Sequence, residues 1–194
     1  TMVFFTYRWM PQNIYARQLL AEDRIGRCRQ ANFQFLMSYA GEQKYAWRFD
    51  GRRANGVLGD LGSHVIDLAR WYLGEIVRVQ ATLANFVDRP SADEQAPVPA
   101  NDAAVLLLEF ASGAQATVQV SAVVNALDKE GWAARSQLYG ETGSLDVSLT
   151  VNDAIGWVQA GTPGIQQLAV PSELWGGSDP NNFADLFCKA PAGP

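Results

Sequence analysis

The ten residues Asn55–His64, with the sequence NGVLGDLGSH, run directly into the apolar-periodic segment Val65–Leu73. Three glycines precede this segment and Gly74 follows it, so the pattern predicts one helix that is bounded at both ends. Asp60 and His64 are four residues apart, a spacing that places their side chains on one helical face, one turn from each other. The core-facing stripe of this helix is predicted to be Val65, Leu68, Ala69 and Tyr72.

A carboxylate beside an imidazole is a simple proton-transfer device. Imidazole titrates near neutral pH, and a neighbouring carboxylate fixes its tautomer and stabilises the imidazolium that forms when it accepts a proton. His64 is the only histidine in the chain. The same Asp60/His64 pair would also fit a surface or helix-capping role, and Asp60, His64 and Asp67 together could ligate a metal. The residues alone leave these three interpretations open.

The run Gly56–Asp67 resembles the Gly-Gly-x-x-x-Asp-x-Gly-x-His signature of the glucose–fructose oxidoreductase/inositol dehydrogenase (Gfo/Idh/MocA) family. Members of that family move a hydride between NAD(P) and a hydroxyl carbon, mostly on sugars and cyclitols. The first glycine of the signature is Asn55 here, a change that we interpret as tolerated because Asn adopts left-handed backbone more readily than other non-glycine residues. The resemblance extends in order along most of the chain, through Phe5–Trp9 (FTYRW), Ile25–Arg27, Trp47–Asp50 (WRFD) and Leu138–Ser144 (LYGETGS).

The resemblance implies roles for six residues. Asp60 and His64 would be the catalytic pair, and Tyr7, Arg8, Trp47 and Arg48 would line a pocket for a small polyol substrate. Trp47 and Arg48 lie in a polar loop that the sequence predicts between Gly41 and Asn55. The residues alone fit equally well a Trp47 that packs under this loop and an Arg48 that pairs with Asp50. No metal site is expected.

The resemblance also implies NAD or NADP as cofactor in the full-length protein. The chain contains neither a Gly-x-Gly-x-x-Gly loop nor the Glu-Lys-Pro segment of the family, so we expect the chain alone to bind no cofactor and to be inactive. We expect the apolar run Met2–Thr6 to be a buried strand. Residues 1–10 would then be the remnant strand and linker of a missing dinucleotide-binding domain. Residues 11–194 would be a substrate-binding and oligomerisation domain, truncated at its C-terminus. The competing hypothesis is a non-catalytic ligand-binding or assembly module of the same fold.

The remaining pattern is one helix followed largely by strands. A helix is predicted from Pro11 to about Glu22, ended by Gly26. Strands are predicted at residues 27–39, 76–87, 102–110, 114–124, 134–139, 144–149, 155–159 and 166–170. Short turns favour antiparallel pairing, and two helices can cover only one face of so large a sheet. We therefore predict an α+β fold, with a large, mostly antiparallel (mixed) sheet and two or so helices on one face.

The other face of the sheet would be either a solvated polar surface or a subunit interface, and the resemblance implies a homo-oligomer formed through it. A net charge of -5 and a pI near 4.8 argue against a nucleic-acid partner. No apolar run approaches the ~20 residues of a membrane span. The two cysteines, Cys28 and Cys188, have no metal or redox spacing, and a cytoplasmic location is expected.

Overall fold

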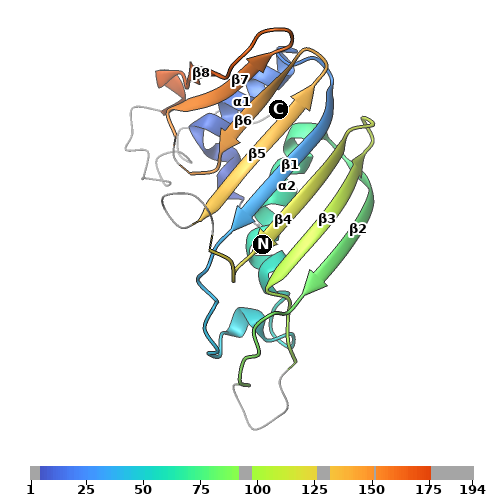
Figure 1. The fold of residues 1–194 in the computed structure, drawn as a ribbon, viewed down its shortest axis with the longest axis vertical. Helices are drawn as coiled ribbons and strands as arrows, with labels where there is room; N and C mark the ends of the chain where they lie inside the picture. The colour runs from blue at the N-terminus through green and yellow to red at the C-terminus, as the bar shows by residue number, and fades with distance from the viewer. Residues whose placement is uncertain (1–4, 92–97, 126–131, 151, 176–194) are drawn as a thin grey trace.

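The computed structural model describes residues 5–91, 98–125, 132–150 and 152–175. Its helices α1 (Pro11–Ala21) and α2 (Ser63–Leu73) lie on one side of a single eight-stranded sheet (Figure 1). The predicted α+β class is confirmed. The strands are β1 (Cys28–Leu36), β2 (Ile76–Ala84), β3 (Ala103–Phe110), β4 (Gln115–Ser121), β5 (Ala133–Gly140), β6 (Gly143–Ser148), β7 (Ala154–Gln159) and β8 (Gln166–Ala169).

The first strand in the chain lies in the middle of the sheet. The spatial order is β2-β3-β4-β1-β5-β6-β7-β8, with β1 parallel to β4 and every other neighbouring pair antiparallel. Parallel neighbours need a long crossover, and here α2 and the strands β2 and β3 lie between β1 and β4 in the chain. The sheet therefore consists of two antiparallel blocks that meet at β1.

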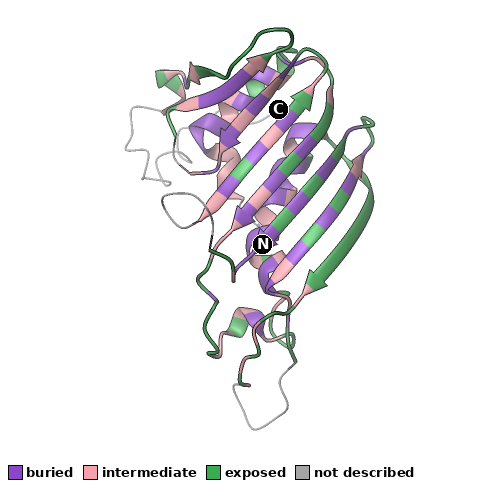
Figure 2. Ribbon diagram, in the orientation of Figure 1, coloured by how far each residue is buried: buried purple, intermediate pink, exposed green. Residues whose placement is uncertain are grey.

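Alternation along the strands decides which side chains reach the helices. In β4 the residues Ala116, Val118 and Val120 are buried, while Gln115, Thr117 and Gln119 are exposed on the opposite face (Figure 2). The predicted stripe of α2 is also confirmed, because Val65, Leu68, Ala69 and Tyr72 are all buried against the sheet. The core thus lies between the two helices and one face of the sheet.

The face of the sheet away from the helices is uncovered in the part of the chain that the structure describes. Val105 and Leu107 of β3 and Tyr139 of β5 are exposed there. The edge strand β2 lies beyond α2, and its residues are exposed on both faces (Figure 2). Val79 and Leu83, which point to the helix side, are consequently also open to solvent.

Two expectations about the N-terminal region need correction. Helix α1 ends at Ala21, and Gly26 does not end it. The chain turns through Asp23, which has a φ of 59°, and Gly26 (φ 67°) lies later, in the connection to β1. The predicted strand Met2–Thr6 lies largely outside the described residues, and Thr6 begins a 3₁₀ helix, Thr6–Trp9.

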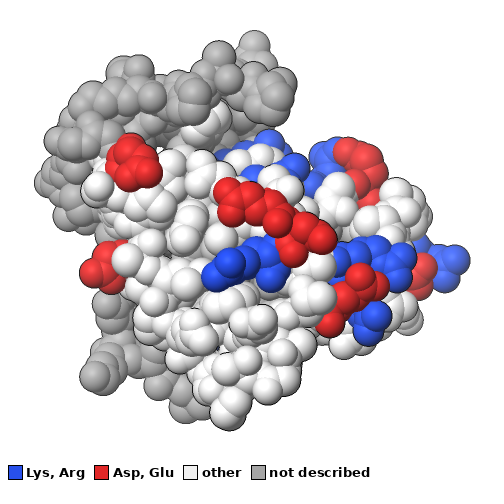
Figure 3. Space-filling view, turned by 90° about the horizontal axis from the view of Figure 1, so that it is seen from above, with Lys and Arg blue, Asp and Glu red and all other residues white. Residues whose placement is uncertain are grey.

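On the face shown in Figure 3, acidic and basic side chains lie next to one another. Among the described residues, none of the helices has the length and apolar character needed to cross a bilayer. Cys28 is a half-buried free thiol, and Cys188 lies outside the described residues.

Candidate functional site

The start of α2 is fixed by Asn101, which precedes β3. The backbone N–H groups of Val57 and Leu58 donate to the carbonyl oxygen (2.8 Å) and to Oδ1 (2.9 Å) of Asn101. Gly56 has a φ of 63°, and a Cβ at this position would lie 2.1 Å from the Asn101 carbonyl oxygen. Only glycine fits there. Among described non-glycine residues only Asp23 has positive φ, so our explanation for the Asn55 substitution was wrong: the left-handed residue is Gly56.

Residues Leu58–Gly62 form a π-helical turn that leads into α2. This turn carries Asp60, whereas His64 belongs to the first turn of α2 itself. The predicted α-helix is confirmed from Ser63 onward, but Asp60 precedes it in a wider turn. Single π turns inside α-helices occur frequently at functional sites.

His64 is half-buried against two aromatic rings. Its imidazole lies edge-on to Tyr7, with 5.0 Å between ring centroids, and to Phe5 at 6.1 Å. The Nδ1 atom is buried and has no hydrogen-bond partner among the described residues. Burial lowers the pKa of His64 from 6.5, and the carboxylates of Asp60 and Asp67 offset this only in part. The imidazole is therefore neutral near pH 7, the form that accepts a proton.

Asp60 is held by the loop that follows β1. Its Oδ2 atom accepts a hydrogen bond from the hydroxyl of Tyr39 (2.5 Å) and lies 3.1 Å from Nε of Arg48. The guanidinium of Arg48 lies 5.1 Å from the ring centroid of Trp47 and 5.8 Å from that of Tyr39. Arg48 thus pairs with Asp60.

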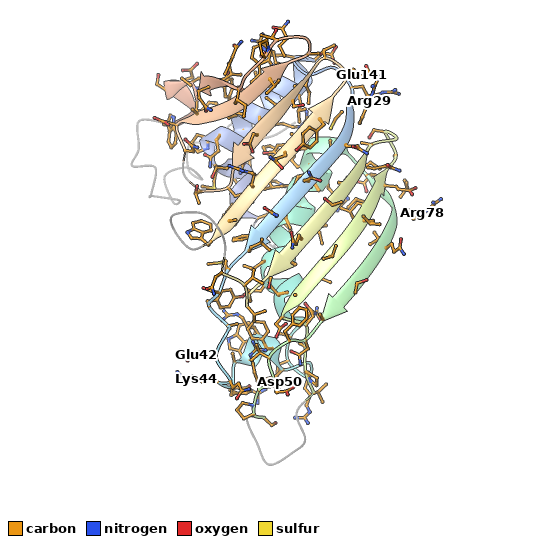
Figure 4. All side chains as sticks on the ribbon, in the orientation of Figure 1. Arg29, Glu42, Lys44, Asp50, Arg78 and Glu141 are labelled. Atoms are coloured by element: carbon orange, nitrogen blue, oxygen red, sulfur yellow. The ribbon has the colours of Figure 1, made fainter. Side chains whose placement is uncertain are left out.

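The alternative pairing of Arg48 with Asp50 was wrong. Asp50 instead faces Arg53, with 3.7 Å between Oδ2 and Nε. Asp50 lies with Glu42 and Lys44 in the loop region that projects beyond one end of the sheet (Figure 4).

Asp67 is engaged by Arg8. The Nε and Nη2 atoms of Arg8 donate to the two carboxylate oxygens of Asp67 over 2.6 and 2.5 Å, a bidentate arrangement. Asp67 is only 7% exposed. Both oxygens of Asp67 are therefore occupied by a cation, which does not suit the metal-ligand interpretation. Within the described ranges, no group of three or more His, Cys, Asp or Glu residues is arranged to hold a metal ion.

The structure places five of the six predicted site residues around the start of α2. Tyr7 contacts His64, Arg48 contacts Asp60 and Trp47 packs on Arg48, whereas Arg8 is turned to Asp67 on the next helical turn. The sequence did not reveal Tyr39, because a tyrosine in the turn after a strand is no recognisable signal for a contact with Asp60.

Comparisons with known proteins identify the family. The model of the GFO/IDH/MocA C-terminal domain matches residues 14–146. Levoglucosan dehydrogenase of Pseudarthrobacter phenanthrenivorans is 30% identical over 162 residues, covering 74% of this chain and 41% of that protein. Inositol 2-dehydrogenase of Rhizobium meliloti is 28% identical over 145 residues, covering 74% of this chain and 40% of that protein.

The fold is also found in solved structures. A levoglucosan dehydrogenase in complex with NADH and levoglucosan superposes with a TM-score of 0.76 at 27% identity, covering 87% of this chain and 46% of that one. The chain therefore spans less than half the length of these relatives.

Proposed function

The chain belongs to the GFO/IDH/MocA family, and we propose that it forms the substrate-binding and proton-transferring part of an NAD(P)-dependent oxidoreductase acting on a hydroxyl carbon of a sugar or cyclitol. The observation that carries this proposal is the half-buried His64, whose lowered pKa keeps it neutral and whose imidazole lies close enough to the Asp60 carboxylate to be affected by its charge. The substrates named for the relatives, levoglucosan and inositol, support a polyhydroxylated ligand.

The residues of this chain would handle the proton of the reaction. In the direction of alcohol oxidation, His64 accepts the hydroxyl proton, and the negative charge of Asp60 stabilises the imidazolium that forms. In the reverse direction the imidazolium returns the proton. Tyr7, Trp47 and Arg48 would supply aromatic surface and hydrogen-bond donors to the ring hydroxyls. Arg8 would act indirectly, since its guanidinium already binds Asp67.

A nicotinamide dinucleotide, when bound, would accept or supply the hydride. The sequence has no Gly-x-Gly-x-x-Gly loop, the element that cradles a pyrophosphate in dinucleotide-binding domains. The residues present thus do not fit the cofactor on their own, and only proton transfer and substrate contact are assigned to them. NADH in the levoglucosan dehydrogenase complex favours NAD over NADP.

The uncovered sheet face would serve as the subunit interface. It combines the exposed apolar residues Val105 and Leu107 with hydrogen-bonded polar pairs such as Thr117 with Asn32 (2.7 Å). A Leu107→Arg substitution places a charge on this face, on the second strand from the β2 edge, and should dissociate the oligomer in sedimentation-velocity ultracentrifugation. An unchanged sedimentation coefficient would assign the face to solvent.

The catalytic role is tested by His64→Gln in the protein encoded by the complete reading frame. Turnover with its polyol substrate should fall by about a hundred- to ten-thousand-fold, the usual contribution of a positioned acid or base, with little change in nucleotide affinity. Steady-state kinetics and a nucleotide titration by calorimetry give the two quantities. Turnover close to that of the unmodified protein would reject the proton-transfer role of His64. Absence of turnover in the unmodified protein itself would favour the non-catalytic ligand-binding module.

A further inference from the structure

Asp60 has polar partners in the structure, whereas Nδ1 of the neighbouring His64 lacks one within the described ranges. The Oδ2 atom of Asp60 is taken by the Tyr39 hydroxyl and lies beside Arg48. Four residues further along the chain, the buried Nδ1 of His64 has no hydrogen-bond partner among the described residues. A buried polar atom without a partner is energetically unfavourable. A movement of the Asp60 carboxylate to Nδ1 would give this atom a hydrogen-bond partner.

We propose that Tyr39 and Arg48 are positioning residues that hold the Asp60 carboxylate away from His64, so that the loop after β1 controls when Asp60 and His64 join. This inference rests on the proposed function only in naming His64 as the group that is controlled. Neither Tyr39 nor Arg48 needs to touch the reacting atoms for this role.

The two positioning residues are accessible to a ligand. Tyr39 is 44% exposed, and the Arg48 side chain is 35% exposed although its guanidinium packs on Tyr39 and Trp47. Both are hydrogen-bond donors, and the hydroxyl oxygens of a polyol are acceptors of the kind they bind. A ligand hydroxyl that takes over these donors would free Asp60 to accept a hydrogen bond from Nδ1–H. Binding of substrate and completion of the proton-transfer pair would thereby be coupled.

The groups around His64 determine how a change of partner by the Asp60 carboxylate can be measured. The charged and titratable groups packed around the imidazole are Tyr7 from the 3₁₀ helix, Asp67 with its bound Arg8, and Asp60 with Tyr39 and Arg48. Tyr39 is protonated throughout the useful range, since burial and then the hydrogen bond to Asp60 raise its pKa. Changes in the titration of His64 after substitution of Tyr39 therefore report on Asp60.

The chain allows a direct experiment because it contains a single histidine. In ¹⁵N-labelled protein, long-range ¹H–¹⁵N spectra give the pKa and the tautomer of His64 without assignment ambiguity. Tyr39→Phe should raise the pKa of His64 by about 1, the usual size for a newly adjacent opposite charge, and shift the neutral ring toward the Nδ1–H tautomer. Asp60→Asn should lower the pKa.

The double variant Tyr39→Phe/Asp60→Asn decides whether the effect of Tyr39 passes through Asp60. It should titrate as Asp60→Asn alone. Tyr139→Phe, which makes the same change on the open face of the sheet, is the matched control and should leave His64 unchanged. The proposal is overturned if Tyr39→Phe leaves the pKa and tautomer unaltered, or shifts them equally with and without Asp60. These titrations need neither substrate nor cofactor, so their outcome is independent of the turnover test on His64→Gln.

Discussion

The two carboxylates nearest to His64 are held in very different ways. Asp67 is 7% exposed, and each of its oxygens accepts a hydrogen bond from Arg8. Asp60 is 34% exposed, and one oxygen alone is shared between Tyr39 and Arg48. A buried fork-to-fork pair is fixed, because its separation would leave a charge without solvent or partner. A half-exposed carboxylate can change partner at little cost, since water replaces what is lost.

The two aspartates near His64 therefore have different roles, and Asp67 is the one that maintains the structure. The Arg8–Asp67 pair ties the 3₁₀ helix Thr6–Trp9 to α2 and so keeps the ring of Tyr7 against His64. A second buried contact reinforces this connection: the amide of Asn13 donates to the carbonyl of Tyr7 (2.7 Å) and accepts from the hydroxyl of Tyr72 (2.9 Å). The contacts of Asp60 with Tyr39 and Arg48 are more exposed than these.

The largest loss of stability is expected when the Arg8–Asp67 pair is broken. Asp67→Ala leaves the guanidinium of Arg8 without its partner, and the free energy of unfolding should fall by about 2–3 kcal/mol, below the range for fully buried pairs because Arg8 is 35% exposed. Urea denaturation followed by circular dichroism measures the loss. The double variant Arg8→Met/Asp67→Ala should recover part of it. A loss as small as that of a surface ion pair would remove the distinction between the two aspartates.

A smaller effect is expected for the hydroxyl that links Asn13 to α2. Tyr72→Phe removes one buried hydrogen bond and leaves the Asn13 oxygen unsatisfied, so unfolding should become easier by about 1–2 kcal/mol. The same denaturation measurement applies, with Tyr139→Phe as the exposed control. Equal stabilities for both variants would mean that the Asn13 contact contributes nothing.

Loss of the ion pair between Asp60 and Arg48 should barely affect the free energy of unfolding. Asp60→Asn is expected to change the free energy of unfolding by less than about 1 kcal/mol, since both partners are about a third exposed. Raising the salt concentration to 0.5 M should remove most of what remains. A destabilisation as large as that of Asp67→Ala would show that Asp60 is structural after all.

The smallest expected effect is the contribution of His64 to the pH dependence of stability. The folded-state pKa of His64 lies below its unfolded value of 6.5, so between these two values the unfolded chain binds more protons and stability increases with pH. Wild-type protein should therefore lose more stability than His64→Gln as pH falls from 7.5 through 6.5 to 5. Denaturation curves at several pH values give the difference. Parallel pH profiles for both proteins would contradict the lowered pKa.

The fold was predictable because periodicity is local. Strict alternation in β4 and the apolar stripe of α2 each occupy a few consecutive residues, and the structure confirms both. The partners within the site could not be predicted, because they join distant segments. Arg8 and Asp67 are 59 residues apart, and Tyr39 and Asp60 are 21 apart. The π turn was not predicted either, because the sequence of Leu58–Gly62 does not distinguish a π turn from an α turn. The contact from Asn101, which is distant in the sequence, is seen only in the structure.

The central position of β1 has a consequence for how the chain folds. The β2–β4 and β5–β8 blocks can each assemble from neighbouring strands, and in the described part of the chain their strands are hydrogen-bonded into one sheet only through β1. Joining them requires contacts such as Asn32 with Thr117, 85 residues apart, whose loop closure is slow. Insertion of β1 is thus expected to limit the folding rate, and substitutions in this strand should slow refolding more than those in either outer block.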